Sequence, residues 1–153
     1  MNCLKMLGLA LLAIAVGCSK PNAPQSAVKV AEPAPHSHGN GPNGGVVFDL
    51  GKYHGEFNID HGKQQCMIVI LGDDEKTPVA VDATELTVAI NETKTADGKV
   101  VPAMTVTAKP QDAVGGKAST FVGTHPGIAN VADFDGTVVG EIDGKPSQGQ
   151  FKE

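Results

Sequence analysis

The sequence predicts an all-β protein whose folded part is a single antiparallel β-sandwich of the immunoglobulin-like kind over residues 44–153. Short apolar or alternating runs follow one another at a spacing of about 8–12 residues, with turn-forming residues between them. After residue 17, no long stretch carries the one-sided apolar pattern of a helix. The runs number about seven to nine, which suits two facing sheets around one modest core.

The first three runs are the clearest strands. Residues 46–50 form an apolar run that ends at a glycine-lysine turn. Residues 53–60 alternate between apolar side chains on one face and polar side chains on the other, which is the period of a half-buried strand. After a turn at residues 61–63, residues 65–71 are almost entirely apolar and indicate a buried strand that contains Cys66.

The later runs are shorter and have stronger turn signals between them. Asp97-Gly98 is a pair favoured in tight hairpins, and Pro102 predicts an edge strand or a break. We expect Asp135-Gly136 and Asp143-Gly144 to separate the last strands. The strands expected in this part are residues 78–82, 85–91, 99–109, 118–123, 131–134 and 137–142, and a last one that ends at Phe151.

The N-terminus predicts export and lipidation. Residues 1–17 have the positively charged start, the short apolar stretch and the small final residue of a secretory signal peptide. The apolar stretch over residues 6–16 would rise only about 16 Å as a helix, too short for a hydrocarbon core of ~30 Å. Ala15-Val16-Gly17-Cys18 resembles a bacterial lipobox, which implies that Cys18 is acylated and becomes the first mature residue. The alternative is an ordinary signal peptide cleaved beside a cysteine.

The segment from the lipidated cysteine to the folded part, residues 18–43, predicts a flexible tether. It is rich in proline, alanine and serine and has no periodic apolar pattern, so it cannot bury enough surface to fold alone. With Cys3 removed and Cys18 acylated, Cys66 is the one thiol left, and no internal disulfide can form. We interpret Cys66 as a small core side chain.

Composition excludes one class of partner and several classes of enzyme. The chain has 12 lysines, no arginine and 17 acidic residues, for a net charge of −5, which argues against nucleic acid binding. It contains no Gly-x-Ser-x-Gly, His-Glu-x-x-His or Cys-x-x-Cys pattern and no phosphate-binding loop. The acidic group Asp73-Asp74-Glu75 lacks the pattern of a calcium loop and is interpreted as a solvated turn. We therefore predict that the protein is not an enzyme.

The histidines are the remaining chemical resource. His54 and Glu56 are two residues apart on a predicted strand, so both side chains leave the same face and could share an ion. His36 and His38, near the end of the tether, could fold over to complete a site of three imidazoles and one carboxylate. Imidazole suits zinc and copper, so one of these is the expected ion.

Each of these residues also has a simpler interpretation. His54 and Glu56 would then be solvated surface, and the flexible arm would bind metal only loosely because ordering it costs entropy. His61 is most simply a turn residue and His125 a loop residue.

One stretch carries a resemblance. It runs from His38-Gly39 through Gly44-Gly45-Val46-Val47 to Gly51-Lys52-Tyr53-His54-Gly55-Glu56. It resembles a pattern in small lipoproteins of planctomycete-type bacteria, and it is similar to segments of periplasmic components of heavy-metal efflux systems. The resemblance implies metal handling and an envelope or efflux-system protein as partner. In this chain Asn43 stands before the glycine pair, where the pattern has histidine.

Together these observations predict a lipid-anchored binding module of the cell envelope without catalytic activity. The membrane would be contacted through the lipid on Cys18. Residue 19 is serine and not the aspartate that commonly retains lipoproteins at the inner membrane, which resembles sorting to the outer membrane, facing the periplasm or the cell surface. Two alternatives stay open. One is a purely structural or protein-interaction domain, and the other is an enzyme with dispersed catalytic residues.

Overall fold

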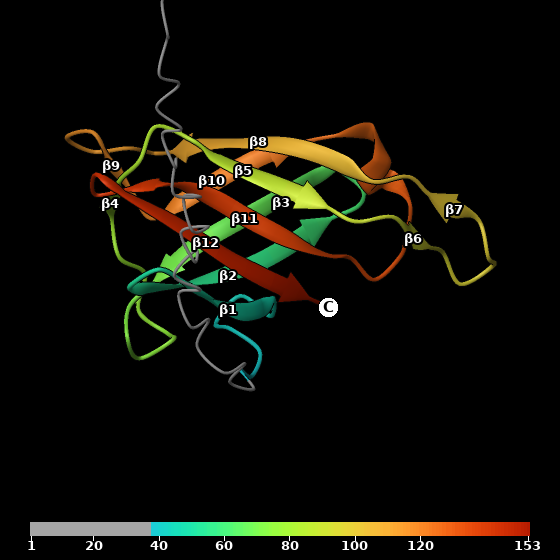
Figure 1. The fold of residues 1–153 in the computed structure, drawn as a ribbon, viewed down its shortest axis with the longest axis horizontal. Coiled ribbons are helices and arrows are strands. Elements are labelled where there is room, and N and C mark those ends of the chain that lie inside the picture. The colour runs from blue at the N-terminus through green and yellow to red at the C-terminus, as the bar shows by residue number, and fades with distance from the viewer. Residues whose placement is uncertain (1–37) are drawn as a thin grey trace, which may run out of the picture. The chain divides into compact units, whose positions relative to one another are not determined.

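The computed structural model describes residues 38–153 of the chain (Figure 1). The predicted signal peptide, the predicted lipidation residue Cys18, His36 and most of the predicted tether lie outside the described residues. The described part consists of strands and one short 3-10 helix. These elements are β1 (Val46–Leu50), β2 (Tyr53–Asp60), β3 (Gln65–Leu71), β4 (Val81–Asp82), β5 (Leu86–Ile90), β6 (Thr93–Lys94), β7 (Val100–Val101), β8 (Met104–Gln111), β9 (Lys117–Ala118), β10 (Thr120–Thr124), η1 (Pro126–Ala129), β11 (Asp135–Ile142) and β12 (Lys145–Lys152).

Eight of the strands form one antiparallel sheet in the order β1-β2-β3-β10-β8-β5-β11-β12. The sheet curls until its end strands β1 and β12 lie side by side, so that it is nearly closed into a barrel (Figure 1). The short pairs β4-β9 and β6-β7 lie at opposite ends of this sheet. The all-β class is therefore confirmed. The immunoglobulin-like sandwich is not, because the main strands join into one curled sheet instead of two facing sheets.

The approach of β12 to β1 depends on Gly149. A Cβ atom at this position would lie 2.0 Å from the carbonyl oxygen of Asp49 and 2.7 Å from the ring of Phe48. Any side chain would push the two strands apart, since a Cβ atom does not come within 3.0 Å of atoms to which it is not bonded. The glycine thus permits β1 and β12 to pack closely although they stand at opposite ends of the hydrogen-bonded strand order.

Most predicted strands are present, and two predictions near the C-terminal part are wrong. Residues 131–134 form no strand, and the preceding residues Pro126–Ala129 form η1, whose first amide is capped by the His125 ring. Asp135-Gly136 lies inside β11 instead of in a turn. Glycine is needed at this position because a Cβ at Gly136 would lie 2.2 Å from the carbonyl oxygen of Ala89 on β5. Glycine permits close contact between strands at this position. The Asp-Gly pattern in the sequence does not distinguish this role of glycine from its role in a turn.

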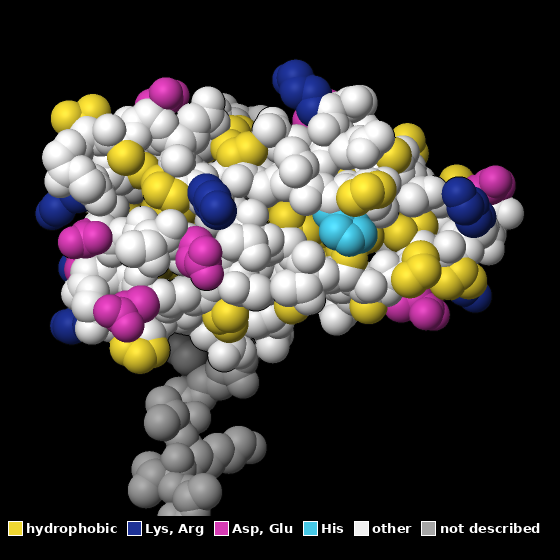
Figure 2. All heavy atoms as spheres, turned by 90° about the horizontal axis from the view of Figure 1, so that it is seen from above, with side chains coloured by type: hydrophobic (Ala, Val, Ile, Leu, Met, Phe, Trp, Pro, Cys, Tyr) yellow, Lys and Arg dark blue, Asp and Glu magenta, His cyan; other side chains and the backbone are white. Residues whose placement is uncertain are grey.

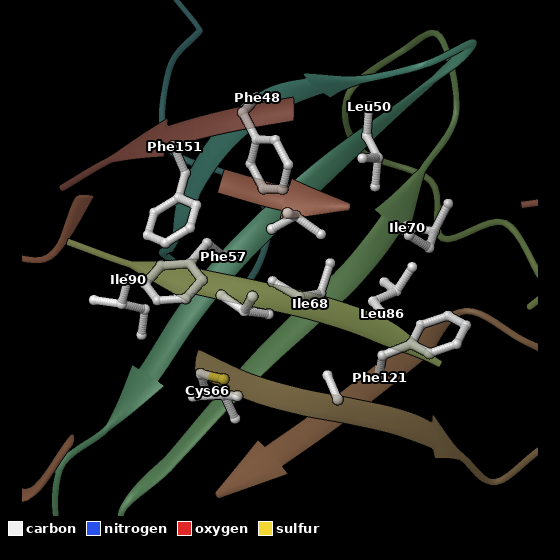
Figure 3. Packing of buried hydrophobic residues seen from close by; sticks show 14 of the residues in the cluster. Phe48, Leu50, Phe57, Cys66, Ile68, Ile70, Leu86, Ile90, Phe121 and Phe151 are labelled. Carbon is white, nitrogen blue, oxygen red and sulfur yellow. The ribbon is translucent and has the colours of Figure 1, made fainter. Parts of the chain in front are cut away.

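The main core fills the inside of the curled sheet (Figure 3). Phe57 on β2 and Phe151 on β12 stack with their ring centroids 3.9 Å apart, and Phe48 on β1 packs beside Phe151 at 6.0 Å. Cys66 is fully buried in the same core, as expected for a small core side chain. These three rings fill the inside of the seam between β1 and β12.

Burial makes Cys66 a poor nucleophile. It raises the pKa of the Cys66 thiol to about 11, and the thiolate is the form that reacts. We expect iodoacetamide to modify Cys66 only when the domain unfolds, with the extent of labelling following the urea unfolding curve. Peptide mass spectrometry measures this, and labelling in native buffer at the rate of an unstructured cysteine peptide would contradict it.

The β11-β12 hairpin is fastened to the β1-β2 turn by one carboxylate. Asp143 accepts hydrogen bonds from the Tyr53 hydroxyl at 2.6 Å and from the Asp82 amide at 3.1 Å, and its Oδ2 lies 3.4 Å from the Lys52 ammonium. The Tyr53 hydroxyl, the Asp82 amide and the Lys52 ammonium, in that order, lower the pKa of the Asp143 carboxyl to about 2. The folded state therefore favours the charged carboxylate.

The lowered pKa of Asp143 predicts how acid changes the stability of the fold. A carboxyl whose pKa is lowered by folding stabilises the native state above its ordinary pKa of 3.8, and this contribution is lost as the pH falls through about 2. We expect Asp143→Asn to be less stable than wild type at neutral pH, with a difference that shrinks below pH 3.8 and disappears only below about pH 2. Urea unfolding followed by circular dichroism at several pH values measures the difference. A difference that does not shrink on acidification would refute this account of Asp143.

Candidate metal site

The outer face of β1, β2 and β3, which points away from the main core, carries a second apolar cluster with one buried carboxylate. In the strand register Glu56 lies between Val47 and Val69, and all three are buried. The Glu56 carboxylate accepts hydrogen bonds from the Asn43 amide at 2.8 Å, the Asn43 side-chain amide at 2.8 Å and the Gly45 amide at 3.0 Å. Glu56 thus holds the chain segment that precedes β1.

The residues before β1 are arranged to fit this carboxylate. A Cβ at Gly41 would lie 2.4 Å from the carboxyl carbon of Glu56, so only glycine lets the chain pass this close. Asn40 forms a bridge with Val46, and the Gly41 amide donates to the Gly45 carbonyl at 2.9 Å. Residues 38–43 form the end of the predicted tether, and these contacts attach them to the sheet. Glu56 accepts the hydrogen bonds that a tether in solution would make with water.

A second cluster lies beside this segment and contains two of the predicted metal ligands. One ligand atom from each of His38, His54 and Glu75 lies within 4.8 Å of the others, a group that could hold a metal ion. His38 comes from the segment before β1, His54 from β2 and Glu75 from the loop between β3 and β4. The rings of His38 and His54 meet edge to face, with their centroids 5.3 Å apart.

Asp49 on β1 also lies beside the two histidines of the cluster. It stands opposite His54 in the β1-β2 register. Its two carboxylate oxygens lie 3.5 Å from Nε2 of His38 and 3.5 Å from Nε2 of His54. Glu75 Oε1 lies 3.1 Å from Nδ1 of His38 and 3.7 Å from Nε2 of His54. Two carboxylates and two imidazoles thus converge on one small volume at the edge of β1 and β2.

The loop that presents Glu75 is held in a defined conformation. Asp74 accepts hydrogen bonds from the amides of Lys76 and Thr77 and from the Thr77 hydroxyl, and the Gly72 amide donates to the Thr77 carbonyl at 3.0 Å. Glu75 itself has a φ of 57°, in the left-handed region that is costly for a residue with a side chain. These bonds hold the strained residue in place, so its carboxylate lies beside the two histidines while its side chain stays 39% exposed.

The hydrogen bonding of His54 shows which kind of ligand the cluster would accept. Nδ1 of His54 lies 3.0 Å from the Gly72 carbonyl oxygen, which can only accept, so Nδ1 carries the proton. In the neutral ring, Nε2 then presents a lone pair toward the oxygens of Asp49 and Glu75. Three electron-rich groups that face each other are stabilised by positive charge, either a proton on the His54 ring or a metal ion bound among them. An imidazole whose far nitrogen donates to a backbone carbonyl is also the usual arrangement of a metal-bound histidine.

The cluster differs from the predicted set of ligands. It brings together His38 and His54, whereas His36 lies outside the described residues. Glu56 is not in the group, because its two oxygens are engaged by Asn43 and Gly45. The carboxylate donor is Glu75, from the acidic turn that we interpreted as solvated.

Sequence reasoning missed Asp49 and Glu75 for different reasons. Asp49 interrupts an otherwise apolar strand, a signal that would have identified it. Glu75 depends on a loop conformation that no spacing predicts. The other two histidines have structural partners: Nδ1 of His61 lies 2.8 Å from the Ile128 carbonyl, and Nδ1 of His125 accepts from the Gly127 amide.

No family model, no curated protein and no solved structure matches the chain. The resemblance to planctomycete-type lipoproteins and to efflux-system components therefore stays a prediction. Between residues 38 and 153, no helix has the length and apolar character needed to cross a membrane. On the face drawn in Figure 2, lysine and acidic side chains are scattered and do not form a patch of one sign.

Proposed function

We propose that the protein is a lipid-anchored binding module of the cell envelope that takes up a divalent transition-metal ion at His38, His54 and Glu75. The observation that carries this proposal is that one ligand atom each of His38, His54 and Glu75 lies within 4.8 Å of the others, with Nδ1 of His54 fixed by the Gly72 carbonyl. Anchoring through Cys18 at the outer membrane rests on the lipobox-like sequence alone.

The donor atoms favour zinc or copper(II). The cluster offers imidazole nitrogen and carboxylate oxygen and no sulfur, whereas copper(I) prefers thiolate or thioether ligands. Calcium and magnesium prefer oxygen donors alone. The histidine side chains are 10% and 18% exposed and the carboxylates about 40%, so an ion could enter from the carboxylate side. These groups are ligands for an ion, and binding is the function that we infer.

Calorimetric titration of the full chain in detergent with zinc and with copper(II) tests the proposal. We expect saturable binding of one ion with a Kd below about 10 μM, and weaker binding at about pH 5, since the neutral imidazole is the form that binds metal. His54→Ala should weaken binding by about 100-fold, since it removes a ligand, and Glu75→Gln by at least about 10-fold.

His61→Ala is the matched control for this experiment. It removes an imidazole that is likewise bonded to a backbone carbonyl but lies outside the cluster, so it should leave the affinity unchanged. If neither metal binds, or if His54→Ala binds as well as wild type, the metal proposal is wrong. A protein-interaction role in the envelope would then be the better hypothesis.

A further inference from the structure

The loop between β3 and β4 joins two of the proposed ligands through one carbonyl oxygen. The Gly72 carbonyl oxygen lies 3.0 Å from Nδ1 of His54, and it also accepts a hydrogen bond from the Glu75 amide at 3.0 Å. One backbone atom thus fixes both the ring of His54 and the main chain of Glu75. The position of these two ligands relative to each other therefore depends on the conformation of residues 72–77.

Glu75 occupies a position in this loop that suits glycine better. Residues 72–75 form a turn closed by the Glu75 amide, and the Gly72 amide donates to the Thr77 carbonyl at 3.0 Å. Glu75 ends the turn with a φ of 57°, a conformation that glycine or asparagine adopts at less cost. A side chain kept in a costly backbone conformation indicates a role other than stability, and the carboxylate of Glu75 lies beside the two histidines.

We propose that Asp74 is a positioning residue of the metal site, which holds in place the turn that presents Glu75 and orients His54 without itself binding the ion. This inference rests on the proposed function and adds to it a residue that is not a ligand. The Asp74 carboxylate accepts hydrogen bonds from the Lys76 amide at 3.0 Å, from the Thr77 amide at 2.9 Å and from the Thr77 hydroxyl at 2.6 Å.

The hydrogen bonds of Asp74 explain how it acts on its neighbour. Oδ1 of Asp74 accepts from the two amides and Oδ2 from the Thr77 hydroxyl, and Asp74 is not in the group of converging ligand atoms. These bonds tie residue 74 to residues 76 and 77, on the two sides of Glu75. Glu75 therefore cannot relax to a negative φ without breaking them, and its carboxylate stays beside the histidines.

Calorimetric zinc titration of the full chain in detergent, with circular dichroism of each variant to check its fold, tests this role. Asp74→Ala removes all three acceptor contacts, so zinc affinity should fall by about 10-fold. Asp74→Asn keeps a side-chain oxygen that accepts from the two amides, so its affinity should stay within about 3-fold of wild type. Asp73→Ala is the matched control, because it removes an exposed carboxylate of the same turn that lies outside the ligand group, and it should leave the affinity unchanged.

A second comparison tests the strained conformation without any metal. Glu75→Gly and Glu75→Ala both remove the carboxylate, but only glycine adopts a positive φ without cost. Glu75→Gly should therefore unfold at a higher urea concentration than Glu75→Ala, the reverse of the order expected where φ is negative. Urea unfolding followed by circular dichroism measures the two midpoints. A lower midpoint for Glu75→Gly would mean that the turn does not hold residue 75 in the left-handed region, and the inference would be overturned.

The zinc titrations separate this inference from the proposed function. If wild type binds zinc and Asp74→Ala binds it equally well, the metal site stands and the positioning role is wrong. If Asp74→Asn or Asp73→Ala loses as much affinity as Asp74→Ala, the turn acts through its negative charge, and the positioning role is again wrong. If wild type does not bind zinc, the proposed function fails and this inference fails with it.

Discussion

Replacing Phe57 with alanine should lower the free energy of unfolding by about 3–5 kcal/mol, the cost of removing a fully buried aromatic ring. Phe57 is 0% exposed and stacks on Phe151 with ring centroids 3.9 Å apart. Stacked aromatic pairs contribute about 0.5–1.5 kcal/mol beyond the area they bury. The rest of the loss comes from the cavity left at the centre of the core.

The position of this pair makes the effect specific to the closure of the sheet. Phe57 belongs to β2 and Phe151 to β12, so their contact crosses the seam where β1 and β12 meet (Figure 3). Urea unfolding should show Phe57→Ala and Phe151→Ala to be clearly less than additive when combined, because both remove the same contact. Phe57→Leu, which keeps most of the apolar volume, should cost less than half as much as Phe57→Ala. Full additivity of the two alanine substitutions would contradict a direct stabilising contact.

The strands were predictable from the sequence because their signals are local. The alternation over residues 53–60 and the apolar run over residues 65–71 reflect burial on one or both faces, and both match β2 and β3. Asp143-Gly144 is a hairpin turn because both residues have positive φ, 50° and 73°. Such turns need only two residues, so a short window of sequence contains all the necessary information.

The arrangement of the strands could not be predicted in the same way. Whether the strands form two sheets or one curled sheet depends on which distant strands pair, and β3 pairs with β10 across about half the domain. The approach of β1 to β12 depends on one glycine, Gly149, and nothing in its sequence neighbours marks that role. A glycine required for close strand contact and a glycine required for a turn look alike in sequence.

The residues of the candidate site were likewise predictable only where their signal is local. His38 and His54 were identified because imidazole is the commonest metal ligand among side chains, so a histidine draws attention by its chemistry alone. Glu56 was assigned as a ligand because side chains two residues apart on a strand share a face, which says nothing of what covers that face. The backbone amides of residues 43 and 45 cover it, and they occupy the carboxylate. Glu75 approaches only because the loop after β3 folds back toward β2.

Replacing Glu56 with alanine should lower the free energy of unfolding by about 2–4 kcal/mol, since hydrogen bonds to a buried charged group are worth more than neutral ones. The substitution leaves the amides of Asn43 and Gly45 without their acceptor and opens a cavity beside Val47 and Val69. Because part of the segment is at the surface, water can replace some of these bonds, which sets the upper limit. Urea unfolding followed by circular dichroism measures the loss.

Two companion variants separate the roles of Glu56 and the metal cluster. Glu56→Gln keeps the shape of the side chain and one carbonyl acceptor, so it should retain part of the stability that alanine loses. Glu85→Ala, which removes a solvent-exposed carboxylate, should change stability by no more than about 0.5 kcal/mol. In Glu56→Ala the segment that carries His38 loses its hydrogen bonds to this carboxylate, so zinc affinity should fall by about 10-fold even though no ligand of the proposed site has been removed. If Glu56→Ala loses zinc binding as completely as His54→Ala while its fold stays as stable as wild type, then Glu56 is itself a ligand and its assignment to holding the segment before β1 is wrong.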